Sequence, residues 1–157
     1  MIKIVVHKKS RAVRIMALIL NKEFKKLGLN SRVIVCDDLE RVSRWSKDVY
    51  FVFTPHKFVD FRRSSDNRNA KFILYQQEQL SEANAFGVDR INQLRSFIDQ
   101  YDHIVEASQM NVPVYKKLMR SVDFILPTAY HDDLEFRNMR GRNPKYDCLF
   151  FGRYSDK

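Results

Sequence analysis

Four polar side chains directly follow a short apolar run near the middle of the chain. The run Phe72-Ile73-Leu74-Tyr75 leads into Gln76, Gln77, Glu78 and Gln79. Four buried-type residues between a basic segment and a polar turn are typical of a central strand in a parallel sheet. Ligands of open α/β sheets bind just beyond the carboxyl ends of such strands. The amides and the carboxylate at this edge suit a ligand that is rich in hydroxyl groups.

Two residues are candidates for acid–base chemistry. His7 stands at the carboxyl end of the first apolar run, and a histidine ordinarily titrates near working pH. Glu78 is the rival base, or an acceptor of hydrogen bonds from ligand hydroxyls. The structural alternatives are a histidine that only bonds a neighbouring loop and a carboxylate that caps the next segment. The residues alone leave both interpretations open.

Other polar residues follow the later strands. Glu106 and Ser108 end a strand predicted at 102–106 and are candidates for lining the same edge, although Ser108 also suits a plain helix cap. His131, Asp132 and Asp133 are consecutive but lack further ligands, which favours a solvated turn over a metal site. We therefore predict no metal and no cofactor.

Composition restricts the class of protein. The chain has 157 residues, of which 45% are hydrophobic and 13% aromatic, enough for one domain with a real core. Its net charge of +9 favours an acidic partner: nucleic acid, an anionic membrane surface or a phosphorylated ligand. The excess lies in residues 3–26 and 62–68, where a merely solvated face is the alternative. Two isolated cysteines and the absence of a long apolar run indicate a cytoplasmic protein.

Apolar periodicity predicts alternating strands and helices. We expect strands at 2–6, 32–36, 49–53, 72–75, 102–106 and 122–126. Helices are expected at 10–27, ending at Gly28, from a cap at Asp37 or Asp38 through Trp45, at 89–100, and after Ser108 or Asn111. Residues 57–69 are interpreted as a mobile surface loop. The pattern predicts an α/β fold: a Rossmann-like, doubly wound, mainly parallel sheet with helices on both faces.

The amino-acid composition of the sequence changes after Pro127. Residues 131–145 are charged and contain Gly141 and Pro144, which is typical of a linker. Residues 146–153 then form an apolar run that enters a glycine turn with no helix behind it. We interpret residues 1–130 as a domain, 131–145 as a linker, and 146–157 as the first strand and phosphate loop of a second domain.

Four segments together resemble the N-terminal half of a GT-B glycosyltransferase, in which two Rossmann-like domains face each other across a cleft. They are residues 75–80, residues 102–108 with Asn111, residues 126–130, and residues 146–153. They are similar in order and spacing to motifs of poorly characterised bacterial and viral glycosyltransferases. The resemblance implies transfer of a sugar from a nucleotide-sugar co-substrate to a glycan or lipid-linked acceptor.

The resemblance also implies roles for particular residues. The N-terminal domain shapes the acceptor site, and the C-terminal domain binds the donor without depending on a metal. On this interpretation the strand-end candidates for catalysis are His7 and Glu78, and the candidates for acceptor binding are Lys8, Gln76, Gln77, Gln79, Glu106, Ser108 and Tyr130. The donor diphosphate-binding residues that the resemblance implies are Gly152, Arg153 and Lys157. Segment 7–11 lacks the glycines found there in many members, which indicates a charged pocket. Because the donor-binding domain is absent, we expect this chain alone not to catalyse efficient transfer.

Two other functions remain open from the sequence. One is a non-enzymatic, Rossmann-like binding module. The other is a basic nucleic-acid-binding domain, which only the net charge and the aromatic residues support. The basic patches also suit peripheral contact with an anionic membrane or attraction of an acidic glycan. The run 146–151 is a candidate for pairing with another copy or a partner chain.

Overall fold

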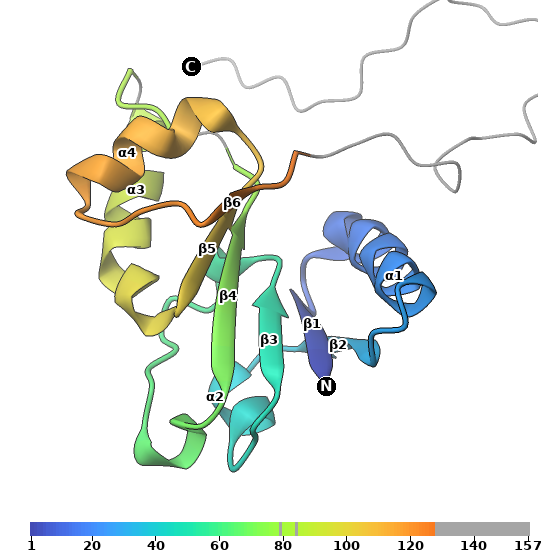
Figure 1. Ribbon diagram of the computed structural model, residues 1–157. Coiled ribbons are helices and arrows are strands. Elements are labelled where there is room, and N and C mark those ends of the chain that lie inside the picture. Colours follow the sequence, from blue (N-terminus) through green and yellow to red (C-terminus); the bar gives the residue numbers. More distant parts are fainter. Residues whose placement is uncertain (79, 84, 128–157) are drawn as a thin grey trace, which may run out of the picture.

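Six parallel strands form the centre of the computed structural model, which describes residues 1–78, 80–83 and 85–127 (Figure 1). The strands are β1 (Ile2–His7), β2 (Ser31–Cys36), β3 (Val49–Val52), β4 (Lys71–Gln76), β5 (His103–Glu106) and β6 (Phe124–Ile125). Several predicted features lie outside the described residues: Gln79, Tyr130, Gly152, Arg153, Lys157, the linker and the second-domain strand.

Four α-helices connect these strands. They are α1 (Arg11–Lys26), α2 (Leu39–Ser43), α3 (Ala85–Phe97) and α4 (Val112–Lys117). Short 3₁₀ turns supplement them: η1 (Pro55–Lys57), η2 (Ser65–Asn67), η3 (Ile98–Gln100) and η4 (Gln109–Asn111). The predicted α/β class is therefore confirmed. Within the described ranges, no helix combines the length and the apolar character that crossing a bilayer requires.

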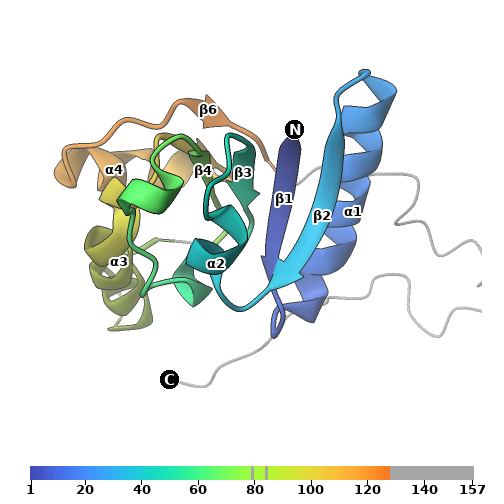
Figure 2. The ribbon, with the colours of Figure 1, turned by 90° about the horizontal axis from the view of Figure 1, so that it is seen from below.

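The sheet is covered on both faces, as a parallel sheet requires. Helix α1 packs on one face, where alternate residues such as Ile4, Phe51 and Tyr75 form a core with its inner side. The remaining helices pack on the other face, over Val52 and Leu74 among others. Figures 1 and 2 show α1 at the β1–β2 end of the sheet, with α3 and α4 beside β4 and β5 at the opposite end. This arrangement is the predicted doubly wound, Rossmann-like fold.

The strand order is β2-β1-β3-β4-β5-β6. After β1 the chain winds outward to β2, and it then crosses over β1 to continue from β3 in the opposite direction. The winding direction therefore reverses between β1 and β3. Crevices of open α/β sheets form outside the carboxyl ends of strands at such a reversal.

Two predicted helix boundaries are confirmed by their hydrogen bonds. Gly28 adopts a left-handed backbone with φ of 75°, and the next amide, of Leu29, bonds back to the carbonyl of Phe24 at 2.9 Å. Such a glycine ends a helix because it carries no Cβ that would clash in this conformation. At the start of α2, the Asp38 carboxylate accepts from the amide of Arg41 at 2.9 Å.

Other local predictions were wrong in detail. Residues 57–69 are not a loop that lies wholly on the surface, because Phe58, Phe61 and Asn67 are buried and the two phenylalanines belong to the core under α3. Their spacing of three lets two apolar rings point inward from an otherwise polar segment. Helix α3 begins at Ala85, four residues before the predicted start, and β6 comprises only Phe124–Ile125.

Candidate functional site

Polar groups from three adjacent strands meet at the carboxyl edge of the sheet. His7 ends β1, Thr54 and His56 follow β3, and Glu78 follows β4. The amide of His7 donates to the hydroxyl of Thr54 at 3.1 Å, which joins the two strand ends on either side of the winding reversal. The edge therefore gathers its polar side chains where this class of fold forms its sites.

The centre of this edge is a cluster of His56, Glu78 and Arg90. The Arg90 Nε of helix α3 lies 2.9 Å from one carboxylate oxygen of Glu78, and the His56 Nε2 lies 3.6 Å from the other. Burial, with the nearby charges of Arg90 and Lys57, lowers the pKa of His56 to about 4. At neutral pH the cluster is therefore a carboxylate held between a guanidinium and an uncharged imidazole.

His7 is buried beside this cluster, with its ring edge-on to Phe58 at 5.2 Å between centroids. Its Nδ1 accepts a hydrogen bond from the amide of Lys9 at 3.2 Å, so the proton of the neutral ring lies on Nε2. Burial lowers its pKa, and the positive charge of Lys9 adds to the effect. In this tautomer His7 offers a donor at Nε2, and action as a base there requires the Lys9 bond to break.

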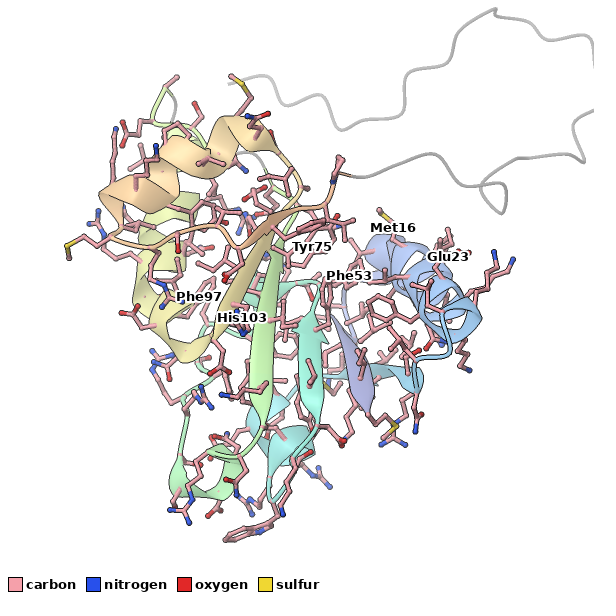
Figure 3. All side chains as sticks on the ribbon, viewed as in Figure 1. Met16, Glu23, Phe53, Tyr75, Phe97 and His103 are labelled. Carbon is pink, nitrogen blue, oxygen red and sulfur yellow. The ribbon has the colours of Figure 1, made fainter. Side chains whose placement is uncertain are left out.

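The predicted row of glutamines is divided between the two faces of the sheet. Gln76 is buried on the α3 side, and its amide nitrogen lies 3.3 Å from the carbonyl of Glu78. Gln77 lies on the α1 side, where its amide nitrogen is 3.8 Å from the sulfur of Met16. On that side the rings of Phe53 and Tyr75 pack edge to face, with 5.0 Å between their centroids, and Met16 of α1 packs against the same core (Figure 3). Of this pair, only Gln76 therefore lies on the side of the cluster.

Lys8 lies on the exposed surface and pairs with Asp37, which directly follows β2. A hollow of about 340 Å³ opens nearby, next to the Phe58 ring that contacts His7. It is lined by Asp37, Asp38, Leu39, Glu40, Lys57, Phe58, Asp60 and Phe61. Its carboxylates make the hollow rich in hydrogen-bond acceptors.

Glu106 lies inside the protein, with no exposed surface. Its carboxylate accepts from the amide of Ser108 at 2.9 Å, from the side-chain amide of Asn111 at 3.0 Å and from the hydroxyl of Tyr115 at 2.8 Å. Burial raises its pKa, and these donors counteract part of that effect. The side chain of Ser108 caps η4 by accepting from the amide of Met110. Both residues thus have structural partners at the end of β5.

Asn111 connects this buried carboxylate to the loop that carries Glu78. Its side-chain nitrogen also donates to the carbonyl of Glu78 at 2.9 Å, and its oxygen accepts from the amide of Leu80 at 2.9 Å. Asn111 was predicted only as a cap, but its side chain makes no cap bond. It positions the Glu78 loop instead.

Among the described residues, no group of three or more His, Cys, Asp or Glu side chains is placed so that it could hold a metal ion. Cys36 is a half-buried free thiol whose pKa is raised to about 11 by burial, so it stays protonated at neutral pH. Cys148 and the His131–Asp133 segment lie outside the described residues.

The sequence interpretation missed two members of the central cluster. His56 follows the third predicted strand after Thr54 and Pro55, so the same argument from strand ends includes it. Arg90 lies six residues into α3, and no local pattern distinguishes it from other helical arginines.

The fold and this polar edge define a Rossmann-like α/β domain with a candidate site at its winding reversal. No family model, no curated protein and no solved structure matches the chain.

Proposed function

We propose that this chain contributes the acceptor-side domain of a GT-B glycosyltransferase, an enzyme that transfers a sugar from a nucleotide-sugar to an acceptor. The observation that carries the proposal is the cluster of His56, Glu78 and Arg90 beside His7 at the carboxyl ends of β1, β3 and β4. The order of the four resembling sequence segments supports it independently.

Glu78 is the group suited to activate an acceptor hydroxyl. Arg90 forms an ion pair with one of its carboxylate oxygens, and His56 lies 3.6 Å from the other without carrying a charge at neutral pH. In an inverting transfer, Glu78 takes the hydroxyl proton while the acceptor oxygen attacks the anomeric carbon and the nucleoside diphosphate leaves. The Nε2 proton of His7 provides a hydrogen bond to an acceptor oxygen.

The residues that we propose to bind the donor lie outside the part of the chain that the structure describes. Gly152, Arg153 and Lys157 are the proposed partners of the donor diphosphate, because a glycine lets the backbone approach phosphate and the two cations neutralise the leaving group. Gln76 and Lys8 remain proposed acceptor contacts. The structural partners of Glu106 and Ser108 make a direct contact with acceptor a weaker assignment for them.

The hollow beside the Phe58 ring favours a neutral, hydroxyl-rich acceptor. The adjacent hollow is lined by four acidic residues and one lysine, Lys57. Carboxylates accept hydrogen bonds from sugar hydroxyls and repel an anionic glycan. We therefore place uncharged glycans ahead of acidic ones as acceptors.

A transfer assay on the natural gene product tests the proposal. The product is incubated with a panel of nucleotide-sugars and with glycan or lipid-linked acceptors, and acceptor-dependent release of nucleotide is measured. Because general-base catalysis contributes roughly 10²–10⁴-fold to rate, Glu78→Gln should lower kcat by at least about 100-fold. Glu82→Gln is the matched control, since Glu82 is an exposed acid that pairs with Lys117.

The outcomes separate the competing functions. Acceptor-dependent release that Glu78→Gln abolishes and Glu82→Gln preserves supports the proposal. Full activity in Glu78→Gln overturns the role of Glu78. Glycan binding without any transfer across the panel overturns the enzymatic proposal and leaves a binding module.

A further inference from the structure

The outward side of α1 combines exposed apolar residues with cations. It consists of Arg14, Ile15, Leu18, Lys22 and Lys25, which we call the outer face of α1. All five are exposed, Ile15 by 54% and Leu18 by 49%. Residues 14, 18, 22 and 25 recur at spacings of three or four, so they share one side of the helix.

The core does not require these residues, because the opposite side of α1 already packs on the sheet. Ala17 is fully buried there, and Val13, Met16 and Leu20 pack against the same core. Phe24 meets Phe51 edge to face at 6.4 Å. Within residues 1–78, 80–83 and 85–127, no other helix lies alongside α1, so in this part of the chain no helix covers its far side (Figures 1 and 2).

The charge of α1 is almost entirely positive. Its sequence holds five basic residues and a single acidic one, Glu23, which lies 2.7 Å from Lys26. Cations at positions 14, 22 and 25 therefore surround the apolar pair Ile15 and Leu18. A helix of this kind suits the boundary between lipid headgroups and acyl chains.

We propose that the outer face of α1 docks on an anionic lipid bilayer and lies in the plane of its surface. The cations meet acidic headgroups, while Ile15 and Leu18 enter the headgroup–acyl boundary. A nucleic acid matches the charge equally well, but its phosphates offer nothing to the two apolar side chains. The proposal concerns a helix on the other face of the sheet from Arg90 of the Glu78 cluster, and it does not rest on the proposed glycosyltransferase function.

Vesicle co-sedimentation of the full chain tests this surface. The vesicles contain either equal parts of phosphatidylglycerol and phosphatidylcholine or phosphatidylcholine alone. Since each basic residue near an anionic surface contributes about fivefold to binding, Arg14→Glu with Lys25→Glu, which also adds two negative charges, should weaken the partition coefficient by at least about 25-fold. Ile15→Ser with Leu18→Ser should weaken it roughly tenfold.

A matched variant controls for the overall charge of the protein. Arg95→Glu with Lys116→Glu makes the same change on exposed positions of α3 and α4, on the other side of the sheet. It should keep binding within about twofold, because charges beyond a Debye length are screened. Circular dichroism checks that every variant is folded.

Three results overturn the proposal. One is equal binding to the two kinds of vesicle, or no binding to either. The second is an equal loss in the control variant, which shows that only net charge matters. The third is a loss in the charge variant alone, with Ile15→Ser and Leu18→Ser silent and a single-stranded DNA oligonucleotide displacing the vesicles, which assigns the face to nucleic acid.

Discussion

Arg63 donates a hydrogen bond to the carboxylate of Asp102 at 2.8 Å and thereby ties the segment between β3 and β4 to the start of β5. The second oxygen of Asp102 accepts from the amide of Phe72 at 2.8 Å. Arg63 also donates to the carbonyl of Ala70 at 3.0 Å. One carboxylate thus connects β4, the start of β5 and the segment before β4, at the edge of the sheet opposite the candidate site.

Asp102→Ala should destabilise the fold strongly. The change removes the acceptor of the Phe72 amide and one acceptor of the Arg63 guanidinium, and a lost bond to a charged group costs about 1.5–3 kcal/mol. The free energy of unfolding, measured in urea, should fall by about 2–3 kcal/mol. Asp99→Ala is the control, because Asp99 is 78% exposed where it pairs with Arg120, and its loss should cost less than about 0.5 kcal/mol. Equal costs would contradict the structural role of Asp102.

The cost of Asp102→Ala should depend on pH. Burial raises the pKa of Asp102, but the Phe72 amide and Arg63 lower it by more, so its pKa lies below the usual value. The unfolded chain binds this proton with a pKa of about 3.9, and the folded protein binds it with a lower pKa. The carboxylate therefore stabilises the folded state fully above the unfolded pKa, and this stabilisation is lost as pH falls through the folded pKa. The difference between wild type and Asp102→Ala should therefore be full near neutral pH and shrink in acid. A difference that grows on acidification would contradict this assignment.

Two buried tyrosines should respond in opposite ways to loss of their hydroxyls. Tyr115→Phe removes a 2.8 Å donor to the buried carboxylate of Glu106 and should lower the free energy of unfolding by about 1.5–3 kcal/mol. Tyr101→Phe should be neutral or stabilising by about 1 kcal/mol, because the Tyr101 hydroxyl is buried with no hydrogen-bond partner among the described residues. Thermal and urea unfolding measure both. Similar losses in the two variants would show that ring packing, not the hydroxyl, decides the effect.

The cost of Tyr115→Phe should increase with pH. The pKa of Glu106 is already raised by burial, and the loss of a donor raises it further. A carboxyl whose folded pKa exceeds its unfolded value binds its proton more readily in the folded state, so its stability contribution falls as pH rises through that interval. The variant should therefore be closest to wild type in acid and furthest from it at alkaline pH.

The fold was predictable because apolar runs mark buried strands locally. The runs at Ile4, Phe51 and Leu74 each occur in strands of the sheet. The strand order was not predictable, because pairing of β1 with β3 depends on contacts between residues far apart in the sequence. The buried Phe58 escaped notice because its neighbours are polar.

The candidate site was only partly predictable, for a related reason. Glu78 and His7 follow apolar runs, so their place at the edge follows from strand direction. The role of Glu106 did not follow from its position, since the three groups that surround its carboxylate depend on how η4 and α4 fold back over β5. Arg90 reaches Glu78 through the packing of a helix, which no local pattern encodes.

His56 should remain uncharged well below the pH at which histidines usually titrate. Burial is the main cause of its lowered pKa, about 4, with Arg90, Lys57 and His7 adding repulsion. The Glu78 carboxylate at 3.6 Å favours the charged form, but burial has the larger effect on the pKa of His56. Proton NMR of the histidine rings, assigned with His56→Gln, measures it directly.

The low pKa of His56 also predicts how stability depends on pH. The unfolded chain binds this proton near pH 6.5 and the folded protein only near pH 4, so stability is lost as pH falls between these values. The loss amounts to about 3 kcal/mol at most, and it should be missing from the pH profile of His56→Gln. A ring that titrates near 6.5, with identical profiles for the two proteins, would instead mean that His56 and Glu78 form an ion pair. In that case the Glu78 carboxylate would be held by two positive charges and would be a poorer base for an acceptor hydroxyl.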